Sequence, residues 1–184
     1  MSKRALILLA PGFEEIEAIT PLDVFRRGGI DAISASITED KAVASARNIK
    51  IVADKFIDEI MDENFDLIYL PGGLDGTENL SKDERVIKLL KRQLEEKRIV
   101  AAICAAPTIL DKHELSKGKK LTCYPTCQDW IKNSTVINEK IVHDECIYTS
   151  QGPGTALEFS LFLLGVLLGE DKKEEIAKAM LFKG

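Results

Sequence analysis

Residues 98–110 read RIVAAICAAPTIL, and this stretch decides the class of fold. The run 98–103 is apolar and of strand length, and the Ala-Ala-Pro after Cys104 favours the start of a helix, because proline suits a first helical turn. A buried strand that turns directly into a helix is typical of an α/β protein. Cys104 then has the placement of a nucleophile elbow, although alanines stand where glycines are usual.

Four further apolar runs of strand length lie outside this stretch. They span residues 4–10, 30–36, 66–70 and 146–149, and helical patterns separate most of them. Such alternation predicts a mostly parallel sheet covered on both faces, which is a three-layer α/β sandwich. A weaker alternation between residues 37 and 54 predicts a short hairpin.

Capping signals predict where three helices begin. Thr20 followed by Pro21 predicts one start, and Gly28 with Gly29 predicts the end of that helix. Capping-box sequences at residues 81–84 and 155–158 predict two further starts. The last of these helices, residues 156–168, is apolar all round, so we expect it to be buried between other elements.

The composition of the chain fits one folded domain spanning residues 1–184. Hydrophobic residues make up 45% and charged residues 30%, and the formal net charge of -5 disfavours a nucleic-acid partner. The apolar run 5–10 is shorter than the hydrophobic region of a secretory signal. The stretch 156–168 is shorter than a membrane span. We therefore expect no membrane partner.

The four cysteines, at positions 104, 123, 127 and 146, are too few for a disulfide scaffold, so reduced thiols in the cytoplasm are expected. Cys123 and Cys127 form a lone C-x-x-x-C pair. A zinc site normally adds a second ligand pair at similar spacing, so metal binding is disfavoured here. These thiols are expected to be buried or to resolve an oxidised partner, and the role of Cys146 stays open.

Three loops that follow predicted strands form the candidate functional region. The first, residues 11–17, carries three carboxylates in four positions; the second, residues 71–73, reads Pro-Gly-Gly; the third begins at Cys104. Glycines leave backbone N–H groups free to face a ligand. Because ligands gather beyond the carboxyl ends of parallel strands, the three loops are expected to meet there.

The local pattern leaves two interpretations of Cys104 open. A helix N-terminus lowers the pKa of a thiol and favours the nucleophilic thiolate. Free cysteine is also among the most buried residue types, so an apolar run that ends in cysteine is often only part of a core.

Carboxylates are better partners for this thiol than either histidine. His113 lies nine residues after Cys104, which is about 13 Å along a helix, and His143 falls in a polar stretch typical of a hairpin turn. A carboxyl that points at a thiolate is expected to have a raised pKa and to donate a hydrogen bond to the sulfur. The other two carboxylates of the first loop are expected to lie on a solvated helix start.

Four segments resemble, in order and spacing, the ThiJ/PfpI superfamily in the branch that contains protein deglycases: APGFEEIEAITPLDVFRRGGI (10–30), DLIYLPGG (66–73), RIVAAICAAPTIL (98–110) and TSQGPGTALEF (149–159). The resemblance implies a flavodoxin-like fold and a homodimer with the thiol near the subunit boundary. It also implies chemistry without a cofactor or a metal.

The resemblance assigns roles to individual residues. It makes Cys104 the nucleophilic and oxidisable thiol and Glu17 its protonated partner. The backbone amides that would hold an oxyanion fall at Gly72, Gly73 and Ala105. The pocket residues it implies are Arg27, Arg47, Tyr124 and Pro153, with Arg47 reaching toward the partner subunit's pocket.

Two positions depart from the superfamily's patterns. The histidine that follows the cysteine in its peptidase-like members is Ala105 here, and the pocket histidine of many deglycase-branch members is Tyr124. A peptidase is therefore not expected. Glu17 is left with a larger share of the proton transfer.

The predicted function is a stress-protective, cysteine-dependent enzyme of the glyoxalase or deglycase type, acting on reactive dicarbonyls or glycated protein. The alternative is a redox-sensing or chaperone-like protein that responds through oxidation of Cys104. A glutamine amidotransferase also uses an elbow cysteine with a later H-x-E, which residues 143–145 mimic. The missing elbow glycines disfavour that interpretation.

Overall fold

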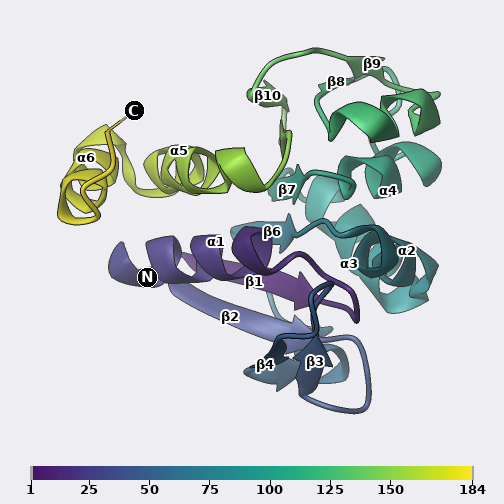
Figure 1. Ribbon diagram of the computed structural model, residues 1–184, viewed down its shortest axis with the longest axis horizontal. Coiled ribbons are helices and arrows are strands. Elements are labelled where there is room, and N and C mark those ends of the chain that lie inside the picture. Colours follow the sequence, from purple (N-terminus) through teal and green to yellow (C-terminus); the bar gives the residue numbers. More distant parts are fainter. Residues whose placement is uncertain (1, 184) are drawn as a thin grey trace.

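The computed structural model describes residues 2–183, which fold around one seven-stranded sheet (Figure 1). The strand order is β10-β11-β7-β6-β1-β2-β5, and only the β10–β11 pair is antiparallel. The strands of this sheet are β1 (Arg4–Leu9), β2 (Asp31–Ser36), β5 (Lys55–Phe56), β6 (Leu67–Leu70), β7 (Ile99–Ile103), β10 (Ile141–Asp144) and β11 (Ile147–Ser150). The predicted mostly parallel α/β fold is thus confirmed.

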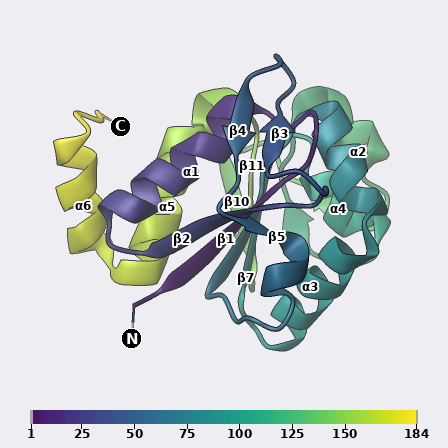
Figure 2. The same cartoon turned by 90° about the horizontal axis from the view of Figure 1, so that it is seen from below.

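Helices cover both faces of the sheet, as Figure 2 shows. One layer holds α1 (Glu15–Arg27), α5 (Ala156–Leu168) and α6 (Glu170–Ala179); the other holds α2 (Leu74–Lys82), α3 (Glu84–Glu95) and α4 (Pro107–Lys112). Alternate residues of β1 serve the two layers, with Ile7 and Leu9 in one apolar core and Leu6 and Leu8 in the other. Full burial of such side chains stabilises the fold by about 1.5–3 kcal/mol each.

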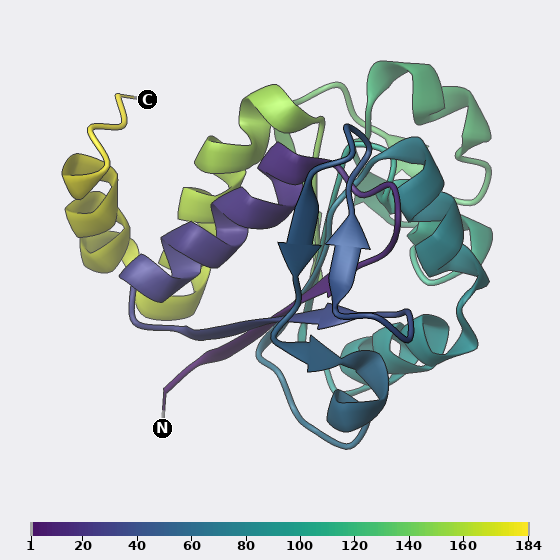
Figure 3. The same ribbon diagram turned by 60° about the horizontal axis from the view of Figure 1, so that its bottom comes forward.

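A hairpin of β3 (Ala42–Ala44) and β4 (Lys50–Val52) confirms the one predicted between residues 37 and 54. Figure 3 shows the hairpin standing between α1 and α2, clear of the main sheet. Backbone hydrogen bonds join it to the first loop, from Gly12 N to Ala44 O (2.9 Å) and from Ala46 N to Phe13 O (2.8 Å). The hairpin therefore borders the carboxyl end of β1.

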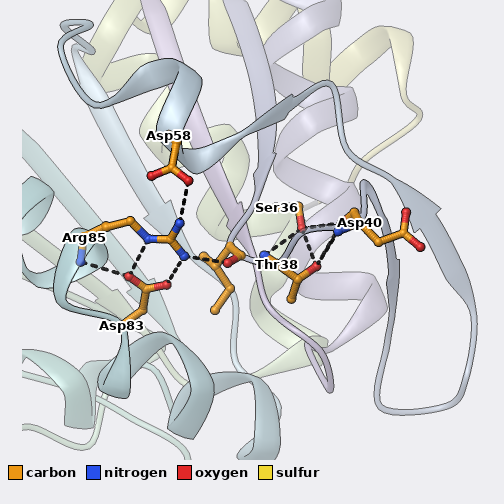
Figure 4. A network of polar contacts seen from close by, with 7 residues as sticks. Ser36, Thr38, Asp40, Asp58, Asp83 and Arg85 are labelled. Carbon is orange, nitrogen blue, oxygen red and sulfur yellow. Dashed lines mark hydrogen bonds and ion pairs between the residues drawn. The ribbon is translucent and has the colours of Figure 1, made fainter.

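An ionic network fixes the start of α3 against the segment that leads into this hairpin (Figure 4). The Arg85 guanidinium contacts the carboxylates of Asp83 (2.6 Å) and Asp58 (2.7 Å) and donates to Ile37 O (2.7 Å). Ser36 Oγ donates to Asp40 O (2.7 Å) just beyond it. Exposed ion pairs contribute little free energy singly, so the effect is mainly on position.

The remaining elements are short. They are the parallel pair β8 (Lys120–Leu121) with β9 (Thr135–Val136), and the 3-10 turns η1 (Ile57–Ile60), η2 (Pro125–Trp130) and η3 (Pro153–Thr155). Between residues 2 and 183, the helices are all too short or too polar to span a membrane.

The predicted start of the first helix is wrong. Helix α1 begins at Glu15, because the Glu14 carboxylate accepts a hydrogen bond from Glu17 N (2.9 Å) and so caps the first turn. Pro21 lies inside the helix, where it removes one backbone donor without ending the helix. A strong capping group upstream outweighed the Thr20-Pro21 signal.

Of the two predicted capping boxes, the one at residues 81–84 is placed wrongly and the one at residues 155–158 is placed correctly. Asp83, not Ser81, caps α3 by accepting from Arg85 N (2.9 Å), and Ser81 belongs to α2. Helix α5 begins at Ala156, directly after Thr155, as predicted, although the Thr155 hydroxyl donates to Gly152 O (2.9 Å) and caps no helical N–H. Other polar partners compete for short polar side chains, which is why the Ser81 motif misplaces the start of α3.

Helix α5 is only partly enclosed, although its apolar composition predicts burial all round. It packs against α1 on one side and α6 on the other, and Phe159 and Leu163 are fully buried. Val166 and Leu168 near its C-terminus remain 42% and 36% exposed. The prediction holds for the first turns and fails for the last.

Candidate active site

The three predicted loops meet at one edge of the sheet. Strands β7, β6 and β1 are neighbours, and their carboxyl ends lead into Cys104, residues 71–73 and residues 10–14. Glu14 N donates to Gly72 O (3.0 Å), which ties the first loop to the second. The site thus lies at the switch region where open α/β sheets hold their functional groups.

Cys104 adopts a left-handed backbone conformation with φ of 62°, which is unfavourable for any residue other than glycine. Hydrogen bonds on both sides fix it: Cys104 N donates to Ser150 O (3.0 Å), and Tyr124 N donates to Cys104 O (2.8 Å). The chain then enters α4 at Pro107. The strained turn presents the thiol at the sheet edge, in the manner of a nucleophile elbow.

Glu17 lies in the first turn of α1 and is fully buried beside the thiol. Its Oε2 accepts a hydrogen bond from Gly72 N (2.8 Å), while its buried Oε1 has no hydrogen-bond partner among the described residues. Burial, aided by the charge of Glu14, raises the pKa of Glu17 to about 7 against the opposing bond from Gly72. This raised pKa agrees with the expectation for a carboxyl that faces the thiol.

The Cys104 thiol is not the low-pKa group that its helix start predicts. Burial, with the charge of Glu17 and a hydrogen bond to that carboxylate, raises the pKa of Cys104 to about 12. The N–H groups of Gly73 and Ala105 act in the opposite direction without reversing the shift. Two negative charges cannot share this buried site, so at neutral pH the pair keeps at least one proton.

Glycine is required where the second loop passes the cysteine. A Cβ at Gly72 would lie 2.6 Å from both Cys104 Cβ and Glu17 Oε2. Gly73 has φ of +86°, and a Cβ there would lie 2.9 Å from Glu14 N. The absence of side chains lets the backbone approach the thiol closely, as expected for a loop that offers N–H donors.

The other two carboxylates of the first loop are buried, contrary to the solvated helix start that the sequence predicts. Glu14 caps α1, as described above. Glu15, only 9% exposed, accepts from the Ser45 hydroxyl and from Arg47 N (2.8 Å). Burial opposes ionisation, yet these hydrogen bonds and the Arg47 charge lower the pKa of Glu15. The two carboxylates organise the hairpin instead of facing solvent.

The predicted pocket residues are only partly brought together. Arg47 approaches Glu14 (3.6 Å) and Glu15 (3.4 Å) of its own chain. Arg27 instead pairs with Asp23 in the last turn of α1, ten residues and about 15 Å of helix beyond Glu17. Within one chain, Arg27 therefore does not reach the thiol.

The Tyr124 ring lies against Gly152, on the segment that also carries Pro153. A Cβ at Gly152 would meet Tyr124 Cδ2 at 3.2 Å. The ring is 41% exposed, and Pro153 begins η3 beside it. The hydrogen bond from Tyr124 N to Cys104 O places Tyr124 beside the elbow.

Neither histidine joins the site. His113 Nε2 lies 3.0 Å from Ser81 O, and the His143 ring stacks on Tyr148 with centroids 5.3 Å apart. His143 lies within β10, so its prediction as a turn residue is wrong. The hairpin turn follows it, at Glu145.

All four cysteines are free thiols. Cys123 and Cys127 are fully buried and form a small apolar cluster with Ala105, against which Cys104 packs. Cys146 lies at the opposite end of β7, where its carbonyl accepts from Val100 N (2.9 Å). No group of three or more potential metal ligands occurs in the described part of the chain.

Tyr69 is a site neighbour that the sequence patterns do not indicate. Its ring packs on Phe159 (centroids 5.9 Å), and its fully buried hydroxyl has no partner in the described structure. Burial, with the charges of Glu17 and Cys104, raises its pKa well above the ordinary value. A tyrosine in an otherwise aliphatic strand is the only signal for it in the sequence.

The raised pKa of Glu17 predicts a measurable dependence of stability on pH. The folded state binds the carboxyl proton more tightly than the unfolded state, so this stability is full below pH 4.5 and is lost as pH rises through about 7. Relative to Glu17→Gln, the native free energy of unfolding should fall by about 3 kcal/mol over that range. Urea denaturation from pH 4.5 to 8 measures the difference.

Glu15→Gln is the matched control, because the pKa of Glu15 is lowered and its contribution has the opposite sign. Its loss of stability should be greatest above pH 4.5 and should vanish in acid. Equal pH dependence in the native protein and Glu17→Gln would show that the Glu17 carboxyl is not held protonated.

Fold and site together define a flavodoxin-like α/β protein with a cysteine on a strand-to-helix turn beside a buried carboxyl. The DJ-1/PfpI family matches residues 3–165, and the chain belongs to this family. The resemblance noted in the sequence is thereby confirmed.

Relatives agree over nearly the whole chain. Protein dj-1beta of Drosophila melanogaster is 42% identical over 98% of each chain. The crystal structure of Drosophila melanogaster DJ-1beta covers 100% of both chains with a TM-score of 0.98 and 40% identity. A Caenorhabditis elegans relative, 34% identical over 97% of this chain and 96% of its own length, is named glutathione-independent glyoxalase DJR-1.2.

Proposed function

We propose that this protein is a cysteine-dependent, cofactor-free enzyme of the glyoxalase or deglycase type, acting on reactive dicarbonyls or early glycation adducts. The observation that carries the proposal is the buried Glu17 carboxyl beside the Cys104 thiol, with a pKa of about 7. A general base or acid works best when its pKa lies near the working pH. The name of the Caenorhabditis elegans relative supports the same reaction class.

The geometry suits attack by the thiol assisted by a base. As Cys104 Sγ bonds to the aldehyde carbon, the Glu17 carboxylate accepts the thiol proton, so a free thiolate with a high pKa need not accumulate. The carbonyl oxygen takes the displaced electron pair. It is held by the N–H groups of Gly73 and Ala105, which already donate toward the sulfur.

The remaining steps need no external oxidant. Glu17 first passes the thiol proton to the oxyanion, which gives a hemithioacetal and restores the Glu17 carboxylate. This carboxylate then carries the proton of the former aldehyde carbon to the neighbouring carbonyl carbon, while the hydroxyl proton passes to the neighbouring carbonyl oxygen. One carbon is thereby oxidised while the other is reduced. The product is a thioester on Cys104. Water cleaves it to release the hydroxy acid and restore the thiol, and the sum is methylglyoxal plus water giving lactate.

The purified protein, supplied with methylglyoxal and no glutathione, is expected to form lactate in proportion to enzyme concentration. An enzymatic lactate assay measures it, with heat-denatured protein and an equal concentration of free cysteine as controls. Lactate formation no faster than in these controls would rule out the glyoxalase form of the proposal.

A second candidate function is redox sensing through Cys104. The N–H groups of Gly73 and Ala105, aimed at the sulfur, are also suited to hold a sulfinate anion. Two equivalents of hydrogen peroxide would convert the thiol to sulfinic acid and release two waters. Mass spectrometry after mild peroxide should show two added oxygens at Cys104 alone, and oxidation spread over all four cysteines would oppose this function.

We further propose that the protein acts as a homodimer in the cytoplasm. Apolar side chains on α1 and the hairpin support self-association, since Ile16, Ile49 and Val52 are 54%, 51% and 71% exposed. Large exposed apolar side chains on neighbouring elements are typical of protein interfaces. A monomeric mass in sedimentation equilibrium would exclude the dimer.

A further inference from the structure

A cleft of about 490 Å³ opens beside the candidate site, between α2 and α4. Figure 2 shows these two helices side by side on one face of the sheet. Leu74 and Thr77 line it from α2, Ala105 and Thr108 from the start of α4, and Trp130 from the end of η2. Its volume falls within the range of about 300–1,000 Å³ that is typical of small-molecule sites.

The cleft adjoins the position where a substrate carbonyl would be held. Helix α2 begins at Leu74, the residue after the donor Gly73. The second donor, Ala105, itself lines the cleft. A group bonded to the carbonyl carbon at Cys104 therefore has the cleft beside it.

The exposed surface of the cleft is largely apolar. Leu74 is 62% exposed and Trp130 is 55% exposed, although both are large hydrophobic side chains. Two polar groups in the walls are already engaged: Thr108 Oγ1 donates to Ala105 O (2.7 Å), and the Asp111 carboxylate accepts from Lys132 N (2.7 Å). The buried Thr77 hydroxyl, by contrast, has no partner among the described residues. The cleft thus has apolar contact to offer and few free polar groups.

The charges around the rim are of both signs. Asp75 and Glu78 lie on the α2 side, and Lys112 and Lys132 lie on the α4 side. Such a mixture attracts neither an anionic nor a cationic ligand strongly. An uncharged apolar group is the occupant that this surface favours.

We propose that this cleft binds an aromatic or bulky apolar substituent on the aldehyde substrate, an inference that rests on the proposed function. The preferred substrates are then α-oxoaldehydes larger than methylglyoxal, whose only substituent is a methyl group. Leu74 and Trp130 act as specificity residues that bind the substituent, while Cys104 and Glu17 carry out the chemistry.

Kinetics with phenylglyoxal and methylglyoxal test the proposal. The native protein should have a kcat/KM for phenylglyoxal at least about tenfold above that for methylglyoxal, because apolar pockets discriminate by roughly this factor. Trp130→Ala and Leu74→Ala should each lose most of that advantage, measured as the ratio of the two kcat/KM values. Trp130→Phe should keep it, because an aromatic face remains.

Leu181→Ala is the matched control for Leu74→Ala, since Leu181 is also an exposed leucine (85%) and does not line the cleft. It should leave both substrates unaffected. Methylglyoxal turnover that depends on Cys104, with no preference for phenylglyoxal, would overturn the cleft proposal and leave the proposed function intact.

Fluorescence tests the cleft without any turnover. Trp130 is the only tryptophan in the chain, so its emission reports directly on the cleft. Mandelate, the hydroxy acid derived from phenylglyoxal, should change this emission saturably and bind at least about tenfold more tightly than lactate. Leu74→Ala should weaken mandelate binding.

Failure of the proposed function and failure of the cleft proposal give different results. Saturable mandelate binding without any turnover would contradict the proposed function while supporting an apolar site in the cleft. An emission that does not respond to mandelate, in a protein that turns over methylglyoxal, would overturn the cleft proposal alone.

Discussion

Replacing Cys104 with alanine is expected to lower glutathione-independent conversion of methylglyoxal by about a thousandfold or more. The reaction begins with a bond from Sγ to the aldehyde carbon, and the structure places no second thiol at the elbow. Cys123 and Cys127 are fully buried beneath it, and Cys146 lies at the other end of β7. Initial rates of lactate formation at saturating methylglyoxal measure the loss.

Cys146→Ala is the matched control, because it removes a partly exposed thiol away from the site. It should keep nearly full activity. Alanine at position 104 preserves the left-handed backbone with φ of 62°, so circular dichroism should show native folding in both variants. Substantial activity in Cys104→Ala would contradict a covalent mechanism on this residue.

Much of the fold follows from patterns that depend on burial. Apolar runs of strand length, such as residues 98–103 and 66–70, correspond to the buried strands β7 and β6. The boundaries of helices are harder to predict, because they depend on which polar side chain forms the capping hydrogen bond. Glu14 caps α1 and Asp83 caps α3, although Thr20 and Ser81 have equally favourable sequence contexts.

The candidate site, like the fold, is predicted only in part by the sequence patterns. The position of Cys104 at the end of a strand is enough to indicate it as a functional residue, whereas only the family resemblance distinguishes Glu17 from the two neighbouring carboxylates. Burial decides that choice in the structure: Glu17 points at the thiol, while Glu15 is turned toward Ser45 and Arg47.

The pKa of the Cys104 thiol shifts in the direction opposite to the one that its sequence position predicts. A helix start lowers the pKa of a thiol that remains solvated, but here burial and the neighbouring carboxyl outweigh it. The reactivity of the thiol then depends on how Cys104 and Glu17 share one proton. No sequence pattern reports the solvation of two side chains that are distant in the chain.

Gly73→Ala is expected to destabilise the protein by about 3 kcal/mol, through backbone strain and overpacking together. Gly73 has φ of +86°, and an added Cβ would lie 2.9 Å from Glu14 N and 3.0 Å from Phe13 C. These atoms belong to the backbone of the first loop, so they cannot rotate aside as a side chain would. Urea denaturation followed by Trp130 fluorescence measures the change.

Gly29→Ala separates the contribution of backbone strain from that of overpacking. Gly29 has the same φ of +86°, but an added Cβ would meet nothing within 4 Å. Its substitution should cost about 1 kcal/mol, the strain of the left-handed conformation alone. The remaining difference of about 2 kcal/mol then measures the clash between the loops. Equal costs at the two positions would show that the first and second loops do not approach as closely as the structure indicates.

Gly73→Ala is also expected to lower the activity. The Gly73 N–H is one of two donors aimed at the sulfur, and any shift of the loop that relieves the clash moves this donor away. Losing one oxyanion donor typically lowers kcat by about 10²–10³-fold. Gly73→Ala should therefore lose activity by this factor even at temperatures where it remains folded, while Gly29→Ala keeps native kcat. A folded Gly73→Ala with native kcat would remove the loop N–H from the mechanism and leave Ala105 as the donor.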